Sequence, residues 1–156
     1  MTYRIRGIDR GEVDGFIGAD DATLADVGAV RVVATVRPGF PCRVSLVDAE
    51  PGESLILFHH VSHDVATPYR SAYAVFVRED AGEPAEYVDQ VPPVFEGRPL
   101  ALRGFDGDAM LRSAALAAPG EADARIRALL DDEGIRYIDV HNAAHGCFAA
   151  RVERHG

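Results

Sequence analysis

The sequence predicts an α+β protein, built as a single compact domain over residues 1–156 with a mostly antiparallel β-sheet, one main helix and a short N-terminal helix. Three observations support this prediction. A chain of 156 residues suits one sizeable hydrophobic core. Strand-like runs rich in β-branched residues outnumber helical ones. Only the segment at about 121–133 shows a clear helical period of apolar residues.

The N-terminal half is expected to alternate short strands with turns. A first strand covers about residues 2–8, and Asp20 or Asp21 caps a short helix over residues 22–27 that Gly28 ends. Further strands are expected, in order, at residues 30–36, 42–47, 53–60 and 71–78. The last two of these should form a hairpin with a long loop.

The C-terminal half begins with a proline-rich loop over residues 80–99, which apolar side chains should hold against the domain. The helix at 121–133 carries an apolar stripe of Ala122, Ile126, Leu129 and Leu130, and Gly134 should follow its end. Strands are expected at residues 100–105, 110–116, 135–141 and 147–153. The last two should form a hairpin around a five-residue loop.

This C-terminal hairpin carries the candidate catalytic residues. Its simplest register pairs His141 with Cys147, and directly opposed residues have Cβ atoms about 4.5–5.5 Å apart. Cys147 is therefore a candidate nucleophile or redox thiol with His141 as its base, and Asn142 or Asp139 would orient the imidazole. The competing interpretation is purely structural, because cysteine is often a small buried hydrophobe.

Cys42 is the second cysteine, and we expect it to join His141 and Cys147 in one local cluster. It begins a predicted strand behind a proline-rich turn, and functional groups gather at such strand ends. The cluster would act as a thiol with its base, as a reversible dithiol pair, or as inert packing. A structural disulfide is not expected in a cytoplasmic protein.

Every one of the 16 basic residues is arginine, which excludes Schiff-base and phosphate-loop lysine chemistry. Arg43 and Arg70, together with Tyr69, are candidate substrate-binding residues, because a guanidinium binds carboxylate or phosphate with two parallel hydrogen bonds. The alternative is that these arginines form scattered surface ion pairs.

No metal site and no cofactor are predicted. His59, His60 and His63 lie near Asp64, but adjacent residues of a strand point to opposite faces, and the spacing matches no standard ligand motif. A solvated polar loop is therefore favoured over a metal site here.

The expected partner is a small anionic ligand. A net charge of −9 argues against nucleic acid and anionic membranes as partners. The sequence shows no signal-peptide pattern and no apolar stretch of membrane-spanning length, which predicts a cytoplasmic protein. The oligomeric state is left open.

Several short motifs together resemble one known family. They are Pro41-Cys42-Arg43-Val44-Ser45-Leu46, Pro51-Gly52-Glu53, Pro68-Tyr69-Arg70-Ser71, Phe76-Val77-Arg78-Glu79, and His141-Asn142 with Gly146-Cys147. The combination is similar to the bacterial family named domain of unknown function 1203 and spans nearly the whole chain. The resemblance implies a single compact domain and lends no reaction, cofactor or catalytic residue. Thr67 stands where the family commonly has serine, a change that keeps the hydroxyl.

Two functional hypotheses follow. In the first, the protein is a small enzyme in which Cys147 reacts with an anionic substrate that Arg43 holds. In the second, the same residues line a pocket of a non-catalytic ligand-binding or protein-interaction module.

Overall fold

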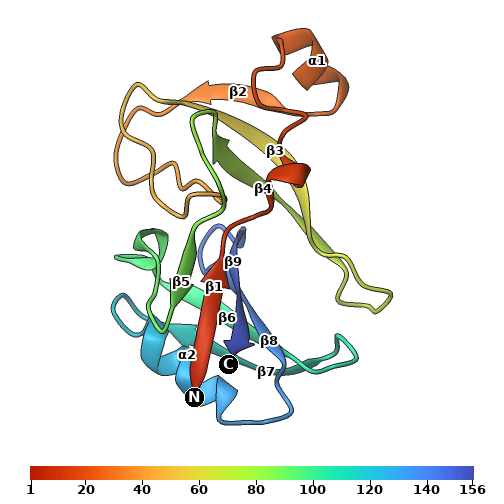
Figure 1. The fold of residues 1–156 in the computed structure, drawn as a ribbon, viewed down its shortest axis with the longest axis vertical. Helices are drawn as coiled ribbons and strands as arrows, with labels where there is room; N and C mark the ends of the chain where they lie inside the picture. The colour runs from red at the N-terminus through yellow and green to blue at the C-terminus, as the bar shows by residue number, and fades with distance from the viewer.

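Nine strands form two antiparallel sheets in the computed structural model, which describes all residues from 1 to 156 (Figure 1). The six-stranded sheet has the order β5-β1-β9-β8-β6-β7, and the three-stranded sheet has the order β2-β3-β4. The strands are β1 (Thr2–Arg6), β2 (Val30–Val33), β3 (Ser54–His63), β4 (Ser71–Arg78), β5 (Glu86–Val88), β6 (Leu100–Phe105), β7 (Leu111–Ala117), β8 (Tyr137–Asn142) and β9 (Phe148–His155). The predicted α+β class is confirmed.

The two helices form where the sequence places them. In α1 (Asp21–Asp26), the Asp20 side chain accepts the Thr23 N–H at 2.7 Å, and Gly28 follows the helix with a φ of 73°. In α2 (Ala122–Leu130), the four residues of the predicted apolar stripe are all buried. Short 3-10 turns occur at Arg10–Glu12 and Pro93–Phe95. Neither helix has the length that a bilayer crossing requires.

Helix α2 is shorter than the predicted 121–133. The residues after Leu130 form a turn in which the Asp132 carboxylate accepts the Gly134 N–H at 2.9 Å. Acidic side chains at a helix C-terminus oppose the helix dipole, which favours this early end.

The elements enclose two main hydrophobic cores. In the first, Ile126 and Leu130 of α2 pack on the six-stranded sheet, in the lower half of Figure 1. In the second, Phe58 and Val75 of the three-stranded sheet pack with Phe148 of β9. The second core also holds Cys42, so it ties the 42–48 segment to both sheets.

Two strand predictions in the N-terminal half are wrong. Residues 42–47 form a turn, in which the Leu46 N–H bonds to the Cys42 carbonyl at 2.9 Å and Leu46 has a φ of 57°. The apolar side chains of this segment divide between the two cores, since Leu46 packs in the first and Cys42 in the second. The buried strand expected at 30–36 is the shorter edge strand β2, which pairs only with β3 and leaves valines exposed.

Candidate functional site

A β-bulge determines which side chains share a face of the C-terminal hairpin. Strands β8 and β9 pair Val140 with Ala150 but His141 with Phe148, so Ala149 is the extra residue. The predicted pairing of His141 with Cys147 is therefore wrong. Because side chains alternate along a strand, Phe148 shares a face with His141, and Cys147 lies on the other face.

His141 consequently serves a packing role. Its Nδ1–H donates to the Gly146 carbonyl at 3.0 Å, and its ring meets the rings of Tyr73 and Phe148 edge-on, with centroids 4.9 and 5.8 Å away. Burial lowers the pKa of His141, which favours the neutral imidazole. Asp139, the other residue expected to orient this imidazole, instead pairs with Arg151.

The structure surrounds the half-buried Cys147 with nitrogen donors. The Asn142 side-chain amide donates to its sulfur at 3.2 Å, and the Arg43 Nη2 lies 3.7 Å from the same atom. The Asn142 N–H also bonds to the Cys147 carbonyl at 2.9 Å, which holds the two residues side by side at the hairpin end. Of the predicted catalytic residues, Asn142 and Cys147 therefore do come together.

Arg43 is the most unusual charged residue of the protein. Only 1% of its surface is exposed, and its Nε and Nη1 have no hydrogen-bond partner. Burial lowers the pKa of Arg43 from its ordinary value, and the nearby Cys147 sulfur counters part of that effect. Its backbone is fixed from two sides, because Arg43 N–H bonds to the Phe76 carbonyl and Ile8 N–H bonds to the Arg43 carbonyl.

These residues face a cavity of about 540 Å³, which we call the Arg43 cavity. Its second arginine, Arg98, is already bound through both Nη atoms to the Asp48 carboxylate at 2.5 and 3.0 Å. No motif of the sequence points to Arg98, which lies near the end of the proline-rich loop. The lining residues are Gly39, Phe40, Pro41, Arg43, Tyr73, Ala74, Val75, Phe76, Arg98, Asn142, His145 and Cys147.

Cys42 does not line this cavity. It is fully buried, and its sulfur accepts the backbone N–H groups of Ser45 and Arg78 at 3.4 and 3.3 Å. Both cysteines are free thiols. Cys42 is therefore a packing residue that closes the 42–48 turn, and a dithiol pair has no support.

Tyr69 and Arg70 lie apart from Arg43. Arg70 is exposed and pairs with Asp64 at 3.3 Å, in the loop before β4. Arg43 instead bonds to Phe76, six residues further along β4, which corresponds to roughly 20 Å of extended chain. The predicted clamp of two arginines and Tyr69 is not assembled. The Thr67 hydroxyl accepts the Tyr69 N–H and donates to the Ala109 carbonyl.

The histidines of β3, which are His59, His60 and His63, do not form a common site. His59 is exposed, whereas His63 donates from Nδ1 to the Tyr69 carbonyl at 2.9 Å and accepts the Tyr137 hydroxyl at Nε2 at 2.6 Å. No three His, Cys, Asp or Glu side chains are arranged to hold a metal ion.

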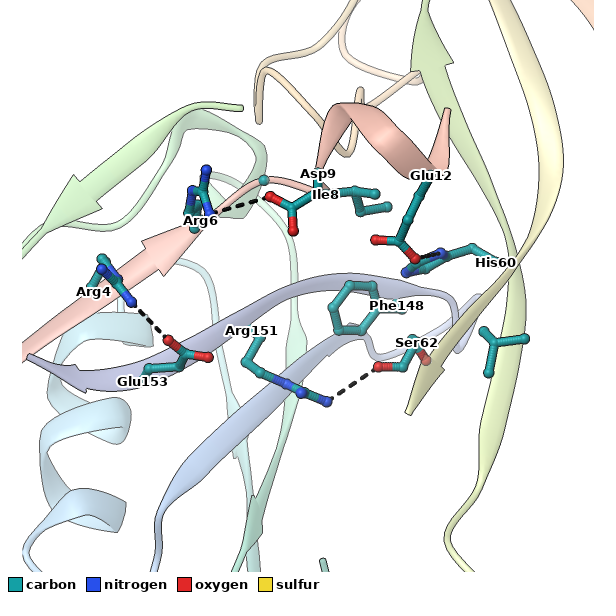
Figure 2. Close-up of a pocket in the computed structure, with 12 residues that line it drawn as sticks. Arg4, Arg6, Ile8, Asp9, Glu12, His60, Ser62, Phe148, Arg151 and Glu153 are labelled. Atoms are coloured by element: carbon teal, nitrogen blue, oxygen red, sulfur yellow. Dashed lines mark hydrogen bonds and ion pairs between the residues drawn. The ribbon is translucent and has the colours of Figure 1, made fainter. Parts of the chain in front are cut away.

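A second cavity of about 220 Å³ lies between β1, β3 and β9, and Figure 2 shows its side chains. Four of its charged groups form two ion pairs, Arg4 with Glu153 at 3.0 Å and Arg6 with Asp9 at 3.2 Å. The third arginine, Arg151, donates to the Ser62 carbonyl at 3.2 Å. All three arginines of this cavity therefore have hydrogen-bond or ion-pair partners, unlike Arg43.

His60 borders the second cavity and should make the stability depend on pH. Its Nδ1 lies 3.6 Å from the Glu12 carboxylate, but burial, with smaller effects of Arg151 and His59, lowers the pKa of His60 to about 4. The unfolded chain takes up this proton near pH 6.5, and the native protein does so only near pH 4. The free energy of unfolding should therefore fall by about 3 kcal/mol as the pH drops through this interval.

Urea unfolding at pH 7, 6, 5 and 4 tests this dependence on His60. His60→Asn removes the titrating group, so the variant should lose about 3 kcal/mol less free energy of unfolding than the parent between pH 7 and pH 4. Parallel pH profiles for the two proteins would contradict the assignment.

The fold and the Arg43 cavity define a class: a small α+β domain in which a buried arginine and a half-buried thiol face one cavity. The chain belongs to the DUF1203 family, since the family described as "Protein of unknown function (DUF1203)" matches residues 39–154. All residues lining the Arg43 cavity lie inside that range, whereas Arg4 to Glu12 of the second cavity lie before it. No curated protein and no solved structure matches the chain.

Proposed function

We propose that the protein is an enzyme that binds a small anionic molecule in the Arg43 cavity and acts on it with Cys147. One observation supports this proposal above all others: Arg43, which lines the cavity, is a buried guanidinium with two nitrogens that have no hydrogen-bond partner. An uncompensated buried charge costs several kcal/mol of stability. A carboxylate or phosphate in the cavity offsets that cost and satisfies the free donors.

The walls of the cavity indicate the rest of the ligand. Phe40 and Phe76 pack together with ring centroids 5.4 Å apart, and Tyr73 lies on β4 near them. Apolar and aromatic walls with a few polar groups are typical of small-molecule sites. The ligand class is therefore an anion with an apolar body, such as an aromatic carboxylate.

The thiol favours a catalytic role over simple binding. Nitrogen donors of Asn142 and Arg43 contact the sulfur of Cys147, and a cysteine reacts as a nucleophile through its sulfur anion. His145 also lines the cavity and is exposed, so it is a candidate proton carrier in place of His141. The alternative function is a non-catalytic ligand-binding module, in which the same residues bind the anion without reacting.

The proposed location is the cytoplasm of a bacterium. Two free cysteines suit a reducing compartment, and the bacterial origin follows from the family resemblance. The net charge of −9 leads us to propose small molecules, rather than nucleic acid or membranes, as partners.

Thermal unfolding with an anion panel tests the binding site. Benzoate, phosphate and sulfate are titrated in a chloride buffer, and at least one should raise the Tm in a saturable way. At a hundredfold excess over Kd, binding adds about 2.7 kcal/mol to the free energy of unfolding. Arg43→Met should abolish the shift, because it keeps an unbranched apolar chain of similar course and removes the charged guanidinium.

Arg70→Met is the matched control, since Arg70 is exposed and lies outside the cavity. It should retain the full shift. The proposal fails if Arg43→Met keeps the shift, or if no anion of the panel produces one.

A further inference from the structure

We propose that Cys147 is a site of reversible oxidation by hydroperoxides, and that Arg43 and Asn142 hold the resulting sulfenic acid in the cavity. The inference uses the donors of the proposed binding site but does not require its ligand. It assigns a second chemistry to this site, in which Cys147 is oxidised by a peroxide instead of attacking a bound anion.

The thiol combines access with a polar environment. Cys147 is half-buried and lines the cavity, which offers a small peroxide a route to this residue. Asn142 Nδ2 and Arg43 Nη2 lie 3.2 and 3.7 Å from this sulfur, and the sulfur anion is the form of a cysteine that attacks peroxides.

The polar atoms near Cys147 that lack hydrogen-bond partners are of the kinds that a sulfenic acid needs. Arg43 Nε and Nη1 are donors without an acceptor, and Asn142 Oδ1 is a buried acceptor without a donor. A sulfenic acid adds one oxygen and one hydroxyl proton at this sulfur. The guanidinium then supplies hydrogen bonds to the new oxygen, and Asn142 Oδ1 accepts the hydroxyl proton. The modification thereby pairs polar groups that the reduced protein leaves unpaired.

The reaction balances with a hydroperoxide as the oxidant. The sulfur anion attacks the distal oxygen, a sulfur–oxygen bond forms and the oxygen–oxygen bond breaks. The departing alkoxide takes up the proton that the thiol had released, so the products are a sulfenic acid and an alcohol, or water when the oxidant is hydrogen peroxide. The sulfur loses two electrons, and the peroxide gains them.

Reduction must come from outside the chain. Cys42 is fully buried and its sulfur is already bound to two backbone N–H groups, so it is not placed to resolve the sulfenic acid. A small external thiol condenses with the sulfenic acid to give a mixed disulfide and water. A second thiol then releases Cys147 and leaves as the external disulfide.

Dimedone trapping with peptide mapping tests the inference on the full-length protein. With hydrogen peroxide present, Cys147 should be labelled and Cys42 should not. Arg43→Met should slow the labelling of Cys147 by about tenfold or more, because a charge-assisted hydrogen bond at the sulfur is lost. Arg70→Met should label at the parent rate.

A second variant keeps the test decisive if Arg43→Met does not fold. Asn142→Asp places a carboxylate where the amide donates to the sulfur, and it should also slow the labelling of Cys147. Parent-like labelling rates in whichever of these two variants folds, or no labelling of Cys147 in the parent protein, would overturn the inference.

The outcome separates this inference from the proposed function. A protein that shows the saturable anion shift but no labelling of Cys147 retains the binding site and loses only the oxidation. Labelling that depends on Arg43, in a protein without any anion shift, supports the oxidation and overturns the proposed ligand site. When both hold, a bound anion should protect Cys147 from labelling.

Discussion

Gly7→Ala is expected to destabilise the protein by about 3 kcal/mol or more. An added Cβ would lie 2.0 Å from the Val44 carbonyl oxygen and 2.8 Å from its carbon. Both are backbone atoms, so the clash is not relieved by rotating a side chain. The strand end and the 42–48 turn must separate, and part of the buried contact between them is lost.

The same substitution should weaken anion binding, because this contact docks the loop that carries Arg43. Gly7 N–H bonds to the Ala85 carbonyl, Ala85 N–H bonds to the Val44 carbonyl, and Ile8 N–H bonds to the Arg43 carbonyl. Moving the turn therefore moves the guanidinium. The anion-dependent rise in Tm should be reduced even at temperatures where the variant remains folded.

Gly11→Ala is the matched control for Gly7→Ala. An added Cβ at Gly11 meets no atom within 4 Å, so the free energy of unfolding should change by less than about 0.5 kcal/mol. Urea unfolding of both variants gives the comparison. Equal stabilities would show that the close approach of Gly7 to Val44 does not exist in solution.

Asp139→Asn should cost about 3 kcal/mol of unfolding free energy. Asp139 is 2% exposed and accepts two hydrogen bonds from Arg151, at 2.7 and 3.0 Å, directly across β8 and β9. The substitution leaves the largely enclosed guanidinium without its counter-charge. An exposed ion pair contributes much less. Asp9→Asn, which breaks the exposed pair of Asp9 with Arg6, should therefore cost less than about 1 kcal/mol of unfolding free energy.

A double variant tests whether the unpaired charge causes the loss. Arg151→Met removes the guanidinium, so adding it to Asp139→Asn should recover a large part of the lost stability. The assignment is wrong if the two substitutions are additive, or if Asp139→Asn unfolds at the same urea concentration as Asp9→Asn.

Elements with local signals were predictable from the sequence. The Asp20 cap and Gly28 fix α1, and the periodic apolar residues of α2 are buried as expected. Strand β4 begins and ends where its apolar run predicts. Caps and periodic apolar runs involve residues that are close in sequence, so these elements can be predicted without knowledge of the tertiary structure.

The candidate site was only partly predictable, because tertiary contacts decide its geometry. Cys147, Asn142 and Arg43 were named from the sequence, and the structure brings them together. The bulge at Ala149 has no sequence signal, and one extra residue exchanges the face of every side chain beyond it. For that reason the sequence predicts a pairing of His141 with Cys147 that the structure does not contain.

Burial was the other property that the sequence did not reveal. Arg43 and Arg70 look alike in the sequence, but Arg43 is buried and Arg70 is exposed in a loop. Arg98 joins the cavity from a segment that carries no motif. Which arginine faces a cavity depends on how the 42–48 turn docks against β4 and the end of β1.

Nuclear magnetic resonance of the arginine side chains tests the central claim most directly. The Nε–H signal of Arg43 is identified by its absence in Arg43→Met, and the protein is then titrated with the anion that raises the Tm most. The Arg43 signal should shift in a saturable way with the same Kd as the thermal effect, and the Arg70 signal should stay unchanged. An Arg43 signal that does not move while the anion stabilises the protein would contradict the claim that this guanidinium binds the ligand.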